Sequence, residues 1–171
     1  MTAQHAIVIF PAFAAAEQIE SVRQDFDPLA TLLPAHVTLV FPFADILEPA
    51  SLREHVIAAA ERTPPFDIAA AAPTAEDDGY LFLRITDGRE TIVALHDRLY
   101  TGILRTHLSL AHAYDPHVTV GRVGSREALD AATATARSRL VSPLRARVDS
   151  VSIFRLDQGA GTVVSVIPLT S

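Results

Sequence analysis

Two four-residue strings repeat in this chain, and each combines an imidazole with a hydroxyl group. They are His36-Val37-Thr38-Leu39 and His117-Val118-Thr119-Val120. Their β-branched and aliphatic residues favour a strand, in which residues i and i+2 point to the same face. Each string therefore places a histidine and a threonine side by side and turns the intervening valine toward a core.

Two such pairs facing each other could break a phosphodiester bond without a metal ion. One histidine would accept a proton and the other would donate one, because the imidazole pKa lies near neutrality. The hydroxyl groups of Thr38 and Thr119 could donate hydrogen bonds to the charged phosphate oxygens. A single string would be better explained as an ordinary structural histidine, whereas two matching strings favour an active site.

Residues 33–42 (LPAHVTLVFP) and 114–122 (YDPHVTVGR) resemble the two signature motifs of the 2H phosphoesterase superfamily. Its members include bacterial 2′,5′-RNA-ligase-like proteins and 2′,3′-cyclic nucleotide phosphodiesterases. The resemblance implies that His36 and His117 are catalytic, and that no metal ion or other cofactor takes part. It also implies that Thr38 and Thr119 are catalytic. It also favours His117 as the base and His36 as the acid, roles that the residues alone leave interchangeable.

Three residues next to the strings are candidates for holding the substrate. Arg122 follows His117 by five positions, so regular alternation would place it on the opposite face. Its contact with a phosphate requires a bulge or a strand end at Gly121. Phe43 and Tyr114 lie just outside the expected strands, and we expect them to stack on a base. Three other aromatic residues are weaker candidates, because aromatic side chains more often pack in a core: Phe41, Tyr80 and Phe82.

Composition limits the class of protein. The chain has 171 residues, of which 49% are hydrophobic, as in one folded globular domain. It has no cysteine, which excludes disulfides, a thiolate nucleophile and a cysteine zinc site. The apolar run at residues 6–16 is interrupted by Pro11 and is too short to span a membrane, and no basic stretch precedes it. We therefore expect a cytoplasmic protein without membrane contact.

Charge is distributed unevenly along the chain. Residues 1–114 contain seven arginines and fifteen acidic residues, a net charge of −8, whereas residues 115–171 contain seven arginines and five acidic residues, a net charge of +2. An acidic protein lacks the broad basic footprint that binds long nucleic acid. We therefore expect a small nucleotide or a short RNA end with a cyclic phosphate as the partner, no long duplex, and a monomeric protein.

The order of the expected elements repeats. In each half, a string-bearing strand is followed by a capped helix and two further strands. The first half is expected to contain a strand at 6–10, helices at 13–26, 51–62 (Ser51 as N-cap, with Glu54) and 89–106, and strands at 36–41, 66–72 and 80–86. The second half is expected to contain strands at 116–122, 145–155 and 162–168, and a helix at 126–140 capped by Ser125.

This repeat predicts an α+β chain with a duplicated, bilobal fold. We expect two antiparallel sheets flanked by helices, with a central cleft that receives one string from each lobe. The resemblance implies the same arrangement. The two lobes would be pseudo-repeats within a single domain at residues 1–171, because no low-complexity linker separates them.

The sequence predicts a metal-independent phosphoesterase that hydrolyses, or reversibly ligates, a 2′,3′-cyclic or 2′–5′ phosphodiester of a nucleotide or short RNA end. Two alternatives stay open. The chain could be a non-catalytic module that binds a nucleotide or an RNA end. It could also be a phosphodiesterase that acts on a cyclic phosphate without a nucleoside.

Overall fold

The computed structural model describes residues 3–44, 47–111 and 113–171. Within them, the strands form one hydrogen-bonded path in the order β10-β9-β1-β3-β7-β6-β4-β8-β2, with β5 beside β6. The strands are β1 (Gln4–Ile9), β2 (Ala12–Phe13), β3 (Val37–Ala44), β4 (Phe66–Ala70), β5 (Thr74–Ala75), β6 (Tyr80–Asp87), β7 (His117–Arg122), β8 (Leu144–Val148), β9 (Ser150–Asp157) and β10 (Ala160–Pro168). The helices are α1 (Ala16–Phe26), α2 (Pro49–Ala60), α3 (Arg89–Leu99), the 3-10 helix η1 (Gly102–His107) and α4 (Arg126–Arg139).

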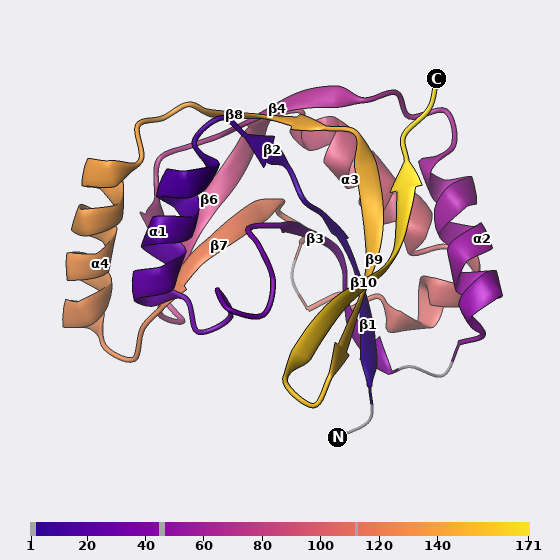
Figure 1. Cartoon of the computed structure of the whole chain (residues 1–171), viewed down its shortest axis with the longest axis horizontal. Helices are drawn as coiled ribbons and strands as arrows, with labels where there is room; N and C mark the ends of the chain where they lie inside the picture. Colours follow the sequence, from indigo (N-terminus) through magenta and orange to yellow (C-terminus); the bar gives the residue numbers. More distant parts are fainter. Residues whose placement is uncertain (1–2, 45–46, 112) are drawn as a thin grey trace.

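The sheet is antiparallel and strongly curled, with β3 and β7 near the middle of the path. Helices α1 and α4 pack together on one side of the molecule, and α2 and α3 pack together on the other (Figure 1). The mixed α and β composition that the sequence predicts is confirmed. The prediction of two separate sheets is not confirmed, because Val37 of β3 pairs with Val118 of β7 and so connects the two halves.

The main core forms from the residues that alternate with the site-facing ones. Val37, Leu39, Val118 and Val120 are fully buried in it, as the alternation in the two strings predicts. Apolar residues of α1, α2 and α3 belong to the same core, including Ile19. One continuous core therefore holds both string-bearing strands in place.

Several element boundaries differ from the expected ones. Helix α2 begins at Pro49, and the carboxylate of Glu48 accepts the first backbone N–H groups, so Ser51 is not its cap. The expected helix at 89–106 ends at Leu99, and the chain continues as η1 from Gly102, where φ is +50°. The expected strand at 145–155 is two strands, since Asp149 separates β8 from β9. The cap at Ser125 is confirmed, and its hydroxyl accepts the N–H of Ala128 at 3.1 Å.

No helix within the described part of the chain is long and apolar enough to cross a membrane.

Candidate functional site

The two strings meet where β3 and β7 pair. Val37 lies opposite Val118 in an antiparallel register. Continuing that register by one residue in each direction sets His36 opposite Thr119 and sets Thr38 opposite His117. All four side chains are half-buried, while the valines between them are fully buried. One face of the paired strands thus carries two histidines and two threonines in a two-by-two arrangement.

Both histidine rings are held in the same way by the residue two positions earlier. The Nδ1 atom of His36 lies 2.9 Å from the carbonyl oxygen of Pro34, and Nδ1 of His117 lies 2.7 Å from the carbonyl oxygen of Asp115. A carbonyl oxygen can only accept a hydrogen bond, so each ring donates its Nδ1–H. The Nε2 atom of each neutral ring is therefore the one that can accept a proton.

His117 is strongly favoured in its neutral form. Burial and the nearby guanidinium of Arg84 lower its pKa to about 4, although the carboxylate of Glu76 opposes the shift. The ring of Phe82 stacks on the imidazole, with 3.7 Å between ring centroids. A neutral, rigidly held imidazole is suited to act as a base.

His36 also has a lowered pKa. Burial is the main cause, and the hydrogen bond to the carbonyl oxygen of Pro34 opposes it. The charges of Arg23 and His117 lower the pKa further, while Asp27 raises it. Without a ligand, burial thus favours the neutral form of both imidazoles.

A buried ionic cluster, which the sequence analysis missed, holds the loop before His36. Arg23 is fully buried, pairs with Asp27 at 2.8 Å and with Glu20 at 2.9 Å, and donates to the carbonyl oxygen of Leu33 at 2.9 Å. Glu20 in turn accepts the backbone N–H of Ala35 at 2.6 Å. In the sequence, the spacing of three and four residues between these charges resembles ordinary surface pairs along a helix.

A second ionic cluster holds Asp115, two residues before His117. Asp115, whose carbonyl oxygen orients the His117 ring, forms ion pairs with Arg84 and Arg89. Arg84 also pairs with Glu76 at 2.7 Å, and it lies opposite His117 across β6 and β7. Arg84 and Asp115 were likewise missed, because nothing in their local sequence indicates that β6 and β7 are neighbours.

Strand β7 contains the bulge that Arg122 requires to share a face with His117. The register between β6 and β7 pairs Thr119 with Phe82 and Gly121 with Leu81, so β7 has one extra residue at this point. Arg122 then pairs with Tyr80 and returns to the face that carries His117 and Thr119. The guanidinium lies over the Tyr80 ring, 4.9 Å from its centroid. Its contact with a phosphate stays a prediction.

The two aromatic residues predicted to stack on a base have other contacts. Phe43 is 4% exposed and packs against His107 and His5 in the core, which corrects the expectation that it faces a substrate. The strand was expected to end at residue 41, whereas β3 extends to Ala44 and holds the Phe43 ring in the core. Tyr114 is half-buried, stacks on His96 with 3.8 Å between centroids, and donates its hydroxyl to the carbonyl oxygen of Thr38 at 2.9 Å. Tyr114 thus connects the two string-bearing segments, and its stacking on a base stays a prediction.

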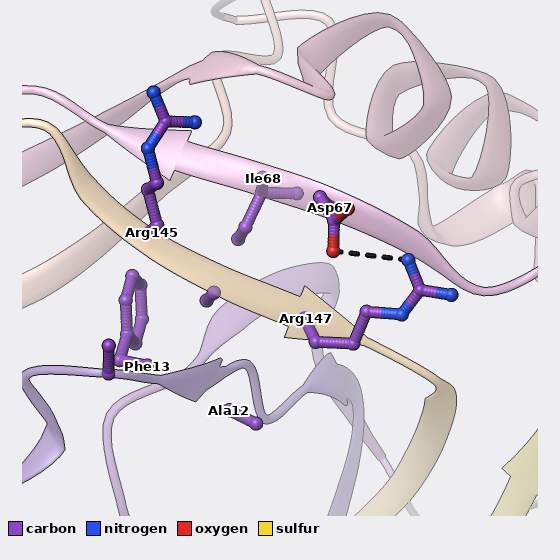
Figure 2. Close-up of a pocket in the computed structure, with 8 residues that line it drawn as sticks. Ala12, Phe13, Asp67, Ile68, Arg145 and Arg147 are labelled. Atoms are coloured by element: carbon purple, nitrogen blue, oxygen red, sulfur yellow. Dashed lines mark hydrogen bonds and ion pairs between the residues drawn. The ribbon is translucent and has the colours of Figure 1, made fainter.

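A hollow of about 350 Å³ lies elsewhere, along β2, β4 and β8. Figure 2 shows Arg145 and Arg147 along β8, with Arg147 paired to Asp67 at 3.1 Å. Strands β4 and β6 separate β8 from β7 in the sheet. Among the residues that the structure describes, no group of three or more histidine, aspartate or glutamate side chains is placed to hold a metal ion. His112 lies outside the described residues.

Comparison with known proteins assigns the family. A family model described as the 2′-5′ RNA ligase superfamily matches residues 11–160. The chain belongs to the 2′-5′ RNA ligase superfamily. The predicted resemblance to the 2H phosphoesterases is thereby confirmed, and membership indicates a phosphoesterase- or ligase-like enzyme.

Relatives and solved structures of this superfamily cover most of the chain. A Bacillus licheniformis protein named "Putative phosphoesterase" is 25% identical over 163 residues, 94% of this chain and 95% of the relative. A Geobacillus protein (strain WCH70) of similar name is 27% identical over 124 residues, 70% of this chain and 69% of the relative. The structure of E. coli LigT complexed with 3′-AMP has a TM-score of 0.65 at 16% identity and 100% coverage of both chains. TT0787 of Thermus thermophilus has a TM-score of 0.71 at 14% identity and 97% coverage of both. The fold is therefore that of LigT.

Proposed function

We propose that this protein opens a 2′,3′-cyclic or 2′–5′ phosphodiester of a nucleotide or short RNA end by general acid–base catalysis without a metal ion. The observation that carries the proposal is the pairing of Val37 with Val118, which brings the two His-x-Thr strings onto one face. The family supports the reaction class. Solved structures of LigT complexed with 3′-AMP, ATP and NADP⁺ support a nucleotide as the ligand.

In the hydrolytic direction, the phosphate would lie between the two histidines. Nε2 of His117 takes a proton from water as the water oxygen bonds to phosphorus. His36, protonated at Nε2, donates its proton to the ribose oxygen as the phosphorus–oxygen bond breaks. Thr38 and Thr119 donate to the non-bridging oxygens, where negative charge accumulates in the transition state. Ligation uses the same groups in reverse.

Both histidines have lowered pKa values, so the free protein holds both in the neutral form at neutral pH. An anionic phosphate between the rings would favour protonation of one of them. The pKa of His117, lowered to about 4, favours its neutral form, which leaves His36 to take this proton. This order supports His117 as the base and His36 as the acid.

Phosphorus NMR of 2′,3′-cyclic AMP in excess EDTA tests the proposal. The wild-type protein should open the ring, and His36→Ala and His117→Ala should each abolish opening. His107→Ala is the control, because His107 belongs to η1 and packs against the core residue Phe43. Opening that survives both substitutions would refute the two-histidine mechanism. Nucleotide binding without any turnover would favour a binding module instead.

A further inference from the structure

The four groups that would surround the phosphate carry no fixed positive charge. His36 and His117 are neutral in the free protein, because burial lowers both pKa values. Thr38 and Thr119 contribute uncharged hydroxyl groups. A phosphodiester is an anion, and hydrogen bonds between charged groups are about twice as strong as those between neutral ones. An arginine within reach of the phosphate would therefore strengthen its binding.

Arg84 is an arginine that lies beside His117 on the same face. The two residues are direct cross-strand partners in β6 and β7, a position in which Cβ atoms are about 5 Å apart. The guanidinium carbon of Arg84 lies 6.0 Å from the centroid of the Phe82 ring, and that ring stacks on the imidazole of His117. The Arg84 side chain is 38% exposed, so a ligand at His117 can reach it.

Two other arginines lie in this region. Arg23 is fully buried, and its guanidinium is already bound by two carboxylates and a backbone carbonyl oxygen. Arg122 pairs with Tyr80, four positions along β6 from Arg84, and its guanidinium lies over the Tyr80 ring. Of these three, Arg84 is the closest to His117 in the strand register, and Arg122 is the rival that the experiment must separate from it.

The guanidinium of Arg84 is held by two carboxylates. Its Nη1 atom donates to Asp115, and its Nη2 atom pairs with Glu76 at 2.7 Å. A guanidinium has more N–H groups than these two contacts use, so it can also donate to a phosphate oxygen. The two carboxylates nevertheless neutralise its charge, and one of them must withdraw before that charge becomes available to an anion.

Glu76 and Asp115 differ in how they can respond to a phosphate. Asp115 also pairs with a second arginine at 3.3 Å, and its backbone carbonyl oxygen orients His117, so it is fixed from two sides. Glu76 lies in the turn between β5 and β6, and its other carboxylate oxygen accepts the hydroxyl of Thr74 at 3.2 Å. Glu76 keeps this partner when it leaves Arg84, so the Arg84–Glu76 pair is the contact that a phosphate can replace.

We propose that Arg84 is a further catalytic residue that binds a non-bridging oxygen of the phosphate, and that Glu76 occupies it in the free protein as an autoinhibitory anion. The inference rests on the proposed function and adds a cation to its mechanism. Phosphate can take the place of the carboxylate because a guanidinium binds both through the same N–H groups. As negative charge accumulates on the phosphate in the transition state, its bond to Arg84 strengthens.

Isothermal calorimetry with inorganic phosphate tests the inference without turnover. Arg84→Gln should weaken phosphate binding about tenfold or more, as for the loss of one hydrogen bond to a charged group. Glu76→Gln should tighten it about two- to fivefold, because the ion pair that the phosphate must replace is lost. Unchanged affinity in Arg84→Gln would overturn the proposal, and so would a lack of binding to both the wild-type protein and Glu76→Gln.

The double variant Glu76→Gln/Arg84→Gln separates the exchange of partners from a general effect of charge. If Glu76 acts by holding Arg84, its substitution should no longer tighten phosphate binding once Arg84 is absent. A gain of the same size in both backgrounds would show that Glu76 only repels the anion, and would overturn the exchange. Arg126→Gln and Asp130→Asn interrupt an exposed ion pair on α4, and as matched controls they should leave the phosphate affinity unchanged.

Turnover of 2′,3′-cyclic AMP keeps the inference separate from the proposed function. Arg84→Gln should lower kcat/KM about tenfold or more. If the wild type does not open the ring, the proposed function fails, whereas the phosphate affinities still decide whether Arg84 binds the anion. A loss of phosphate binding in Arg122→Gln with none in Arg84→Gln would assign the cation to Arg122 and overturn the proposal.

Discussion

At the scale of single residues, the orientation of each string histidine is fixed by a backbone carbonyl oxygen. The imidazoles of His36 and His117 donate Nδ1–H to the carbonyl oxygens of Pro34 and Asp115. The tautomer is therefore set before a substrate binds, and each Nε2 is left for proton transfer. The threonines need no such partner, because a β-branched side chain has few χ1 rotamers in a strand.

Thr38→Val and Thr119→Val should each lower kcat/KM about a hundredfold, the usual loss for one transition-state donor. Valine has nearly the shape of threonine and suits a strand, so the unfolding midpoint should hardly change. Turnover of 2′,3′-cyclic AMP and a thermal melt measure the two quantities. Unchanged turnover in either variant would show that its hydroxyl does not touch the phosphate.

The pH dependence of kcat/KM should be bell-shaped, with its maximum on the acid side of neutrality. The base must be neutral, so activity is lost as the pH falls toward the pKa of His117, about 4. The acid must be protonated, so activity is also lost as the pH rises through the pKa of His36, which lies below the usual 6.5. Initial rates from pH 4 to pH 9 measure this, and a flat profile would contradict the assignment of both histidines.

At the scale of elements, the segments before the strings position the histidines as much as the strands do. His36 lies one residue before β3, at the end of a loop that leaves α1. Side chains of α1 hold that loop through the carbonyl oxygen of Leu33 and the N–H of Ala35. The position of His36 therefore depends on α1, and small displacements of a catalytic group are costly.

Glu20→Ala should lower kcat about tenfold or more, because it removes the acceptor for the N–H of Ala35. Glu20→Gln keeps an oxygen acceptor and should retain most of the activity. Glu17→Ala, at an exposed position of the same helix, serves as the control. If the alanine and glutamine variants lose activity equally, the charge opposite Arg23 matters and the hydrogen bond to the loop does not.

Gly121→Ala should destabilise the protein by about 1–3 kcal/mol, as expected for overpacking. The new Cβ atom would lie 3.0 Å from the Cβ atom of Phe26 and 3.3 Å from that of Leu81. Gly124→Ala is the matched control, since no heavy atom lies within 4 Å of a Cβ atom placed there. Urea unfolding measures both variants, and equal stability of the two would show that α1 moves aside without cost.

At the scale of the whole molecule, the face that carries both His-x-Thr strings lies where the two halves of the chain join. The strands of both halves form one curled sheet, and one core lies behind β3 and β7. Burial of His36 and His117 at this junction is the main cause of their lowered pKa values. The same burial must then make the stability of the fold depend on pH.

The free energy of unfolding should fall as the pH is lowered from about 6.5 toward 4. In this range the unfolded chain binds a proton at His117, whereas the folded chain, with a pKa of about 4, does not. Stability therefore rises with pH across this window and loses this dependence above it. Urea unfolding at several pH values should show a smaller decrease in the free energy of unfolding for His117→Gln than for the wild type. An identical decrease in the two proteins would assign the pH dependence to other groups.

Local patterns account for the elements that could be predicted. Alternation within the strings correctly assigned the faces of β3 and β7, and the hydroxyl of Ser125 correctly marked the start of α4. Predictions failed where a competing local group was present: Glu48 caps α2 in place of Ser51, and Gly102 interrupts the long helix. These differences depend on backbone geometry that residue preferences describe only on average.

The residue types and their alternation were enough to predict the two strands that bear the His-x-Thr strings and to identify the family. They could not specify which strands are neighbours. The pairing of Val37 with Val118 and the bulge before Arg122 arise from contacts between segments far apart in the chain. The buried Arg23 cluster and the burial of Phe43 also arise from such contacts. Local sequence sets a side chain's chemistry and its face of a strand, whereas its partners depend on how the whole core packs.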